Sequence, residues 1–285
     1  MRPNAMTDDA IARRQQEIIQ QHGPWTNHNL RLGDHLYTMS DETCSGAEVK
    51  VRRVLQAVRD FCGEDLSRLR VLDLACLEGL YGLELALHGA TVVGLEGRES
   101  NLAKARFSQE VLHLDNIEFV CDDVRNLSRE RYGSFDVVLC IGIFYHLNAP
   151  DVFEFAQHIA DVSSRLALFD THVSSTAEQA YEYRGQTYWG RSYAEDHMAW
   201  GSIGNEESAW LTRPSLYNLL ADVGFDSVYE CHQPMVPKYE QMRQAGQADR
   251  STFLALHNPP HPLKTTDLLR NQTRDRYGDG SQSAL

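Results

Sequence analysis

The 285-residue sequence lacks the patterns that mark several whole classes of protein. No apolar run approaches the ~20 residues that a helix needs to cross a bilayer, and the polar N-terminus has no apolar block of a secretory signal. The six cysteines are scattered and form no CxxC pair, which favours reduced thiols over a disulfide or metal framework. We therefore expect a cytoplasmic protein with no membrane-embedded segment.

Basic residues are also in short supply. Against 40 Asp and Glu there are only 27 Lys and Arg, a formal net charge of −13. Since Lys and Arg contacts to phosphates dominate nucleic-acid affinity, this balance argues against a broad polyanion-binding surface but leaves a local one open.

What the sequence does contain is an alternation of strands and helices through the middle of the chain. Short apolar runs predict five strands, at 70–75, 91–95, 117–121, 134–140 and 165–171. Helical spacing of apolar residues predicts helices at 80–88, 100–112, 150–163 and 214–223, and two closing strands follow at about 226–233 and 251–257. This order predicts an α/β fold, a Rossmann-like seven-stranded, mostly parallel sheet with helices on both faces.

The remaining segments suggest how the chain is divided. Two helical patterns predict an N-terminal helical extension or cap over residues 1–62, before a main domain at 63–258. Within that domain, the polar and aromatic residues 173–209 form an insert after the fifth strand, placed to act as a lid. Residues 259–285 read as a disordered tail.

Acidic residues follow the predicted strands at the edge where an open parallel sheet binds its ligands. Asp73 closes the first apolar run and Glu96 the second, and Asp122 and Asp123 follow the third. An acid at the second strand can accept from both ribose hydroxyls, and an acid after the third can accept from an adenine amine. The pattern predicts a nucleoside cofactor.

The loop after the first strand, "DLACLEG", argues against a dinucleotide. A pyrophosphate site needs G-x-G-x-x-G, but Ala75 and Leu77 stand where glycines would be wanted, and the loop holds no Lys or Arg. Asp73 and Glu78 flank it instead, and their negative charge suits a cation.

Three stretches resemble, in order, the motifs of class I S-adenosylmethionine-dependent methyltransferases: "VLDLACLEGLYGLELALHGATVVGLEGRESNLAKARF", "CDDV" and "FDVVLCIGIFYHL". The resemblance covers about residues 65–170 and keeps only Gly79 of the usual D-x-G-x-G-x-G loop. It implies S-adenosylmethionine as cofactor, with Ala75, Glu78 and Gly79 at the methionine part, Glu96 at the ribose, Asp122, Asp123 and Val124 at the adenine, and Ile141 and Tyr145 beside the sulfonium. Asp73 and Gly97 complete this set of cofactor-binding candidates.

If the methyl acceptor is a hydroxyl, a base helps to remove its proton. His146 in "IFYHL" and His172 in "FDTHV" follow the fourth and fifth strands and are the catalytic candidates, with structural hydrogen bonding as the alternative for each. Asp170 lies two residues before His172 and could orient it, but no third ligand is spaced to suggest a metal site there. The fourth strand also lacks an Asn/Asp-Pro-Pro-aromatic motif, which would resemble that of the methylases acting on exocyclic amines of nucleic-acid bases.

The segments "GIFYHL", "HNLRLG" and "KVRRVL" are also similar to wobble-uridine tRNA methyl- and carboxymethyltransferases. In the carboxymethyl-transferring members a basic residue, a tryptophan and a lysine hold the extra carboxylate of a modified cofactor. The matching positions are Arg31, Ser45 and Lys50, so the tryptophan is missing and plain methyl transfer is favoured. Lys50 is a cofactor-binding candidate, with a solvated helix lysine as the alternative.

The insert at 173–209 is dense in Tyr and Trp and carries more acids than arginines. Such a segment suits a pocket for a flat or amphipathic small molecule, while base stacking and a homodimer contact are its other uses. The sequence therefore predicts methyl transfer to a small molecule, at oxygen, in biosynthesis. A tRNA-modifying enzyme and a non-catalytic cofactor-binding subunit are the alternatives.

Overall fold

The computed structural model describes residues 6–39, 47–195, 201–231, 237–245 and 249–259. Most of the predicted C-terminal tail, residues 260–285, lies outside the described residues. The chain divides into two compact units, Met1–Val124 and Arg125–Leu285, and each is described by itself below.

Seven strands make up the main sheet: β1 (Arg70–Leu74), β2 (Thr91–Glu96), β3 (Ile117–Cys121), β4 (Phe135–Ile141), β5 (Ser163–Val173), β9 (Ser227–Cys231) and β10 (Asp249–Leu256). Their order is β3-β2-β1-β4-β5-β10-β9. β1 runs parallel to β2, β2 to β3 and β4 to β5, whereas β10 is antiparallel to both β5 and β9. The predicted Rossmann-like, seven-stranded and mostly parallel α/β sheet is confirmed.

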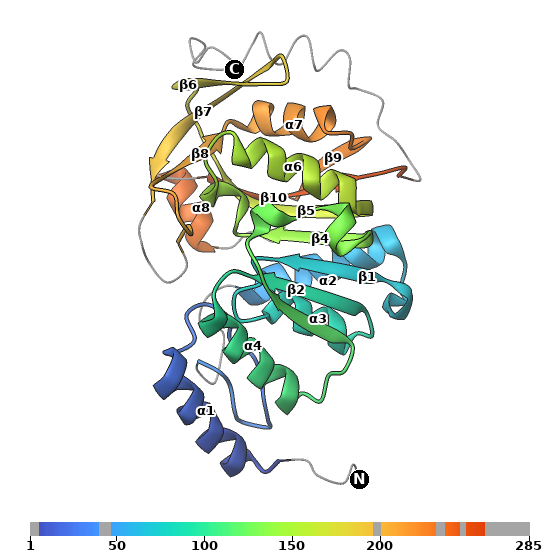
Figure 1. Cartoon of the computed structure of the whole chain (residues 1–285), viewed down its shortest axis with the longest axis vertical. Coiled ribbons are helices and arrows are strands. Elements are labelled where there is room, and N and C mark those ends of the chain that lie inside the picture. The colour runs from blue at the N-terminus through green and yellow to red at the C-terminus, as the bar shows by residue number, and fades with distance from the viewer. Residues whose placement is uncertain (1–5, 40–46, 196–200, 232–236, 246–248, 260–285) are drawn as a thin grey trace. The chain divides into compact units, whose positions relative to one another are not determined.

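In the first unit, helices α3 (Leu80–Leu87) and α4 (Glu99–Val111) pack on strands β1 to β3 (Figure 1). The interior is aliphatic, and Leu72, Leu74, Leu83, Leu95 and Leu102 have no exposed surface. Two further helices, α1 (Asp8–His22) and α2 (Ala47–Cys62), form the predicted N-terminal extension. α1 begins at the capping side chain of Thr7 and packs along α4, where Arg14 bonds Glu110 at 2.6 Å.

In the second unit, α6 (Asp151–Val162) packs on β4 and β5, and α7 (Arg213–Asp222) begins at the capping hydroxyl of Thr212. A further helix, α8 (Pro237–Gln244), precedes β10. The sequence analysis did not predict α8, because its segment has little apolar periodicity.

The insert after β5 is a small sheet of its own, with the order β6-β7-β8. Its antiparallel strands are β6 (Gln179–Tyr183), β7 (Gln186–Ala194) and β8 (Glu207–Leu211), so the insert extends two residues beyond the predicted 209. Tyr181 and Tyr188 face each other across β6 and β7, are both buried, and pack against Phe153 of α6. The aromatic residues noted in the sequence therefore partly form a core between this sheet and α6.

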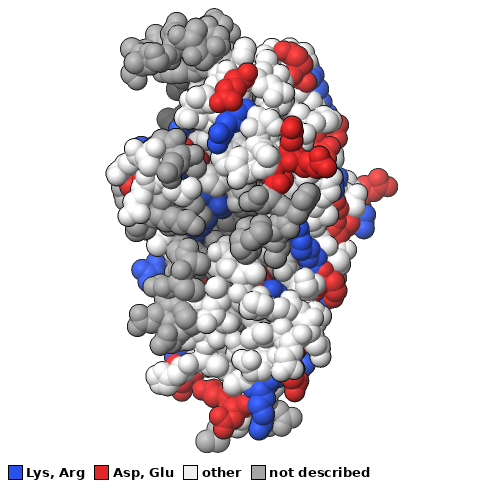
Figure 2. All heavy atoms as spheres, turned by 90° about the vertical axis from the view of Figure 1, so that its left-hand side faces the viewer, with Lys and Arg blue, Asp and Glu red and all other residues white. Residues whose placement is uncertain are grey.

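No helix in the described part of the chain combines the length and the apolar character needed to span a bilayer. On the face drawn in Figure 2, the Lys and Arg side chains of the described residues lie in small groups among Asp and Glu. This distribution agrees with the acidic balance of the sequence.

Candidate active site

The carboxyl ends of β1 and β2 carry two buried acids in the first unit. Asp73 of β1 is 1% exposed and accepts a hydrogen bond from the Gly82 amide at 2.9 Å. A Cβ at position 82 would lie 3.1 Å from Oδ2 of Asp73, so a glycine permits this close approach. Burial raises the pKa of Asp73 to about 7, against the Gly82 hydrogen bond and with the help of the Glu96 charge.

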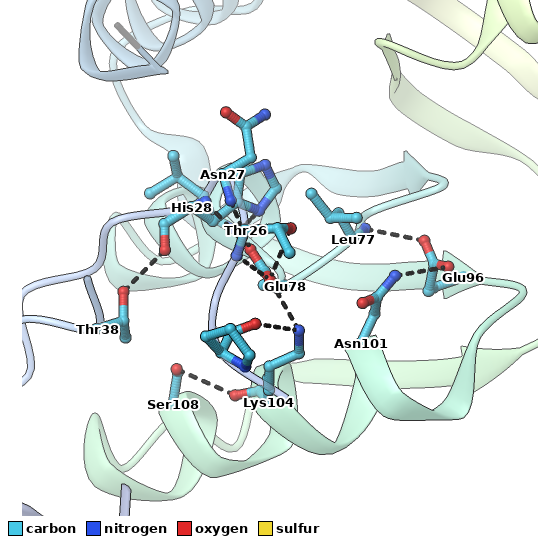
Figure 3. A network of polar contacts seen from close by, with 12 residues as sticks. Thr26, Asn27, His28, Thr38, Leu77, Glu78, Glu96, Asn101, Lys104 and Ser108 are labelled. Carbon is cyan, nitrogen blue, oxygen red and sulfur yellow. Dashed lines mark hydrogen bonds and ion pairs between the residues drawn. The ribbon is translucent and has the colours of Figure 1, made fainter. Parts of the chain in front are cut away.

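Glu96 ends β2 and is held by three donors. Its carboxylate accepts from the Leu77 amide at 3.0 Å and the Asn101 side chain at 3.2 Å, which are drawn in Figure 3, and from the Arg98 amide at 3.0 Å. Burial raises the pKa of this carboxyl, although all three hydrogen bonds oppose the rise. A carboxylate has about four acceptor positions, so Glu96 can still accept from a bound molecule while the protein fixes its orientation.

The loop from 75 to 79 keeps a left-handed backbone at three positions. The φ angles are 50° at Ala75, 51° at Leu77 and 85° at Gly79. Ala75 and Leu77 are the two positions where the family motif has glycine, and a left-handed φ costs a residue with a Cβ about 1–2 kcal/mol. Because Leu77 donates to Glu96 and Cys76 donates to Leu95, the loop keeps this backbone shape without those glycines.

Glu78 fastens the N-terminal segment to this loop (Figure 3). Its carboxylate accepts from the amide and hydroxyl of Thr26, from the amides of Asn27 and His28, and from Lys104 Nζ at 2.9 Å. Burial alone would raise the pKa of Glu78, but the charges of His28 and Lys104 and these hydrogen bonds lower it. The oxygens predicted to line the methionine part of a cofactor are thus engaged by donors of the protein itself.

His28 donates its amide to Glu78, and the charge of Lys50 acts on the His28 ring. The sequence analysis did not single out His28. The His28 ring accepts from the Leu80 amide through Nδ1 at 3.2 Å, which puts the proton of the neutral ring on Nε2. Burial lowers the pKa of His28 to about 4; the charge of Glu78 opposes this shift and those of Lys50 and Lys104 add to it. Lys50 of α2 is 8% exposed, so the alternative of a solvated helix lysine is wrong.

The other first-unit candidates lie around the bends after β2 and β3. Gly97 is exposed, Asp122 donates its amide to the Glu96 carbonyl at 3.1 Å, and the Asp123 amide bonds the Asp122 side chain. Val124 is buried. Their contacts with adenine or ribose stay predictions. Arg31 is largely exposed and bonds its own loop at Gly33 and Asp34, and Ser45 lies outside the described residues.

In the second unit, His172 of β5 belongs to an aromatic cluster. Its ring lies parallel to Trp210 of β8 with a centroid distance of 4.6 Å, and Tyr145 meets it edge-on, also at 4.6 Å. Tyr145 belongs to a short 3-10 helix, Phe144–His146, that follows Ile141 at the end of β4.

Asp170, expected to orient His172, directs its two oxygens to β10. Oδ1 accepts from Arg250 Nε at 2.6 Å, and Oδ2 accepts from the Thr252 hydroxyl at 2.8 Å. Arg250 also donates to the Tyr145 hydroxyl at 3.0 Å, so Asp170 helps to place Tyr145 through this arginine.

His146 pairs with a carboxylate that the sequence analysis did not single out. Nδ1 of His146 lies 2.8 Å from Oε2 of Glu195, the residue that follows β7. The side chain of Glu195 is 2% exposed and that of His146 is 12% exposed. Burial opposes ionisation of Glu195, but the hydrogen bond and charge of His146 bring its pKa below the ordinary value. The two residues are 49 positions apart, and no local pattern in the sequence links them.

A comparison with known families matches the middle part of the chain. Residues 71–165 match the model of a family described as "Methyltransferase domain". The chain is 33% identical over 85 residues to a ubiquinone biosynthesis O-methyltransferase from Acinetobacter baumannii (strain AYE), a match that covers 30% of this chain and 36% of that protein. Another protein of that name, from Neisseria meningitidis serogroup A, is 34% identical over 123 residues, which cover 42% of this chain and 50% of that protein. The matches thus span half or less of the length of these relatives.

Solved structures share the fold over more of the chain. The N-terminal domain of EvdMO1, crystallised in the presence of SAH and D-fucose, has a TM-score of 0.70 at 24% identity and covers 90% of this chain and 100% of that chain. Magnesium protoporphyrin IX methyltransferase (ChlM) from Synechocystis PCC 6803 with bound SAH has a TM-score of 0.51 at 18% identity, covering 75% and 84%. At these identities the likeness shows a common fold.

Proposed function

The chain contains a methyltransferase domain of the class I S-adenosylmethionine-dependent type, and from this premise we propose that the protein transfers a methyl group to a hydroxyl oxygen of a small molecule. The observation that carries the proposal is the pair of buried carboxylates, Asp73 and Glu96, at the ends of adjacent parallel strands. The loop that follows Asp73 has a left-handed backbone at three positions, and this shape supports the proposed nucleoside cofactor site.

The residues present fit a cationic cofactor. Burial raises the pKa of both Asp73 and Glu96, so each would be stabilised in its ionised form by a nearby positive charge. The loop between them brings no Lys or Arg that could neutralise a pyrophosphate. S-adenosylmethionine carries a sulfonium and an ammonium group, and Glu96 has acceptor capacity left for ribose hydroxyls. Lys50, buried in the first unit, suits a carboxylate of the same molecule.

Bound S-adenosylmethionine would supply an electrophilic methyl group. The larger part of the protein's contribution is to hold the reactants in line, which accounts for roughly 7–11 kcal/mol of a barrier in well-oriented reactions. Glu96, fixed by the Leu77 and Arg98 amides, would hold the nucleoside, and Asp73 would favour the positive charge. In the second unit, His146 and His172 are the groups that could take a proton from an acceptor hydroxyl.

A small hydroxyl compound suits the rest of the observations best. The two curated relatives are named as O-methyltransferases of ubiquinone biosynthesis, and the EvdMO1 domain was crystallised with a sugar. The charge of −13 does not favour a polyanionic acceptor. A tRNA acceptor, a homodimer and a cytoplasmic location stay predictions, as do the lid role of the insert and the assignment of each cofactor contact.

The test separates cofactor binding from transfer. We expect Glu96→Ala to weaken S-adenosylmethionine binding by about 10- to 150-fold, because a hydrogen bond to a charged group contributes roughly 1.5–3 kcal/mol. Glu96→Gln keeps the size of the side chain and removes its charge, so it should fall between wild type and Glu96→Ala. Isothermal titration calorimetry measures both, and an unchanged affinity in Glu96→Ala would contradict the placement of the ribose.

Transfer itself is tested with labelled S-adenosylmethionine and two probe acceptors, D-fucose as an aliphatic hydroxyl compound and catechol as a phenolic one. Label recovered as a methyl ether of either probe supports the hydroxyl acceptor. A matching set of amines is tested in the same way. If the protein binds the cofactor but label is recovered only on these amines, the proposal of a hydroxyl acceptor is contradicted.

A further inference from the structure

We propose that Glu195 is a positioning residue for His146, and that it fixes this imidazole with Nδ1 protonated and Nε2 available to accept the proton of an acceptor hydroxyl. The role of His146 as base rests on the proposed function. The pairing with Glu195 and the tautomer that follows from it rest on the geometry of the second unit alone.

The contact is short and protected from solvent. Nδ1 of His146 and Oε2 of Glu195 are 2.8 Å apart, and the Glu195 side chain is almost wholly buried. The Ser202 amide also donates to Oε2 of Glu195 at 3.3 Å. The backbone is tied as well, because the Asn205 side chain donates to the His146 carbonyl at 3.0 Å and to the Glu207 carbonyl at 2.7 Å.

This arrangement selects one tautomer. An ionised carboxylate only accepts hydrogen bonds, so its imidazole partner must donate. Burial opposes ionisation of Glu195, but the hydrogen bond from His146, the charge of a protonated His146, the Ser208 hydroxyl and the Ser202 amide together bring its pKa below the ordinary value, so the carboxylate is ionised at neutral pH. A neutral His146 therefore carries its proton on Nδ1 and a lone pair on Nε2, as in other acid-oriented histidine bases.

The proposed step balances with one proton moved. A bond forms between the acceptor oxygen and the methyl carbon, and the bond between that carbon and sulfur breaks with its electron pair left on sulfur. The acceptor proton goes to Nε2 of His146, and the resulting imidazolium is stabilised by Glu195 before it releases the proton to water.

His172 is less suited to the same task. Its ring lies flat against Trp210, with an interplanar angle of 7°, and Tyr145 packs on it edge-on. Asp170 gives its two oxygens to Arg250 and Thr252. These contacts place the His172 ring inside the aromatic cluster, whereas the His146 ring is bonded directly to a buried carboxylate.

Other charged and titratable groups face His146 from the elements packed around it. Tyr145 lies against its ring at 4.3 Å, and beyond Tyr145 are His172 of β5 and the Arg250–Asp170 ion pair. Each of these stays in place in the variants below, so a change caused by substitution at Glu195 reports on the pair.

The tautomer is measured directly by two-dimensional ¹⁵N–¹H NMR of the histidine rings in the full-length protein, with His146→Asn identifying the His146 signals. In wild type we expect the Nδ1-protonated pattern. Glu195→Ala removes the acceptor and should give a mixed or Nε2-protonated pattern. Glu182→Gln, an exposed acid of β6 bonded to Thr187, is the matched control and should leave the signals in place. An Nε2-protonated ring in wild type, or an unchanged pattern in Glu195→Ala, would overturn the proposal.

Turnover supplies the second reading, with formation of S-adenosylhomocysteine on D-fucose or catechol as the measure. A positioned base contributes about 10²- to 10⁴-fold, so His146→Asn should lose at least about 100-fold in kcat. Glu195→Gln should lose at least tenfold, Glu195→Asp should recover part of that loss, and calorimetric affinity for S-adenosylmethionine should change by less than twofold in all three. Wild-type turnover retained in Glu195→Gln would overturn the proposal. If wild type methylates neither probe, that result counts against the hydroxyl acceptor. The NMR measurement of the His146 tautomer still tests the pairing of His146 with Glu195.

Discussion

Two buried groups of the first unit should make opposite contributions to stability as the pH changes. The folded protein binds a proton on Asp73 more tightly than the unfolded chain, because burial raises that pKa from 3.8 to about 7. It binds a proton on His28 more weakly, because burial lowers that pKa from 6.5 to about 4. The Asp73 contribution is complete below pH 3.8 and is lost as the pH rises toward 7, whereas that of His28 is complete above pH 6.5 and is lost as the pH falls toward 4.

The two contributions nearly cancel between pH 4 and 6.5. In this window each changes the free energy of unfolding by about 1.4 kcal/mol per pH unit, with opposite sign. Asp73→Asn removes one of them and keeps a side-chain oxygen that can accept from the Gly82 amide. The free energy of unfolding of this variant should therefore rise by roughly 3 kcal/mol relative to wild type as the pH increases from 4 to 6.5.

Urea unfolding at pH 4.5, 5.5 and 6.5, followed by circular dichroism, measures this difference. His28→Asn is the reciprocal variant: it keeps an acceptor for the Leu80 amide and should leave the Asp73 slope, so its stability should fall with pH relative to wild type. If Asp73→Asn differed from wild type by a constant amount across these pH values, the carboxyl would be ionised in the folded protein and our account of its burial would be refuted.

Two further predictions concern the same unit. Glu78→Gln should destabilise the protein by about 3–5 kcal/mol, because it leaves the buried ammonium of Lys104 without its counter-charge, and Lys104→Met should cost a similar amount. In urea titrations, the double variant should lose clearly less free energy of unfolding than the sum of the two single losses. Additive losses would contradict a coupled Glu78–Lys104 pair. Ala75→Gly should stabilise by about 0.5–1 kcal/mol, because release from a left-handed φ outweighs the entropy that glycine loses on folding. A lower unfolding midpoint in Ala75→Gly would show that the methyl group contributes packing that outweighs this conformational cost.

The sheet and the acids at the ends of β1 and β2 could be predicted from the sequence because their signals are local. Short, mainly apolar runs mark the strands, and Asp73 and Glu96 lie at or next to the ends of two of them. The burial of both acids follows from their place beside these strands. That Ala75 and Leu77 keep a left-handed backbone could not be predicted, because the conformation depends on the bond from Leu77 to Glu96, 19 residues away.

The contacts of His146 and His172 could be predicted only in part, because their partners come from distant segments. His146 was a candidate from its position after β4, but its bond to Glu195 depends on the pairing of β7 with β8. Asp170 was assigned to His172 from their spacing, whereas the antiparallel register of β10 brings Arg250 and Thr252 to it. The strands of the insert were missed because their alternation is carried by tyrosine, which is amphipathic and marks neither face clearly.

The hydrogen bonds from residues 26–28 to Glu78 bear on where the folded domain begins in the sequence. Similarity to the methyltransferase family starts at Val71, yet the carboxylate seven residues later accepts hydrogen bonds from three amides and a hydroxyl of residues 26–28. A truncated protein starting near the first strand would retain Glu78 and Lys104 but strip away the peptide that shields them from water. We therefore expect the folding unit to begin before the segment that sequence similarity delimits, and an expression boundary should be set before Pro24, whose carbonyl also accepts from Lys104.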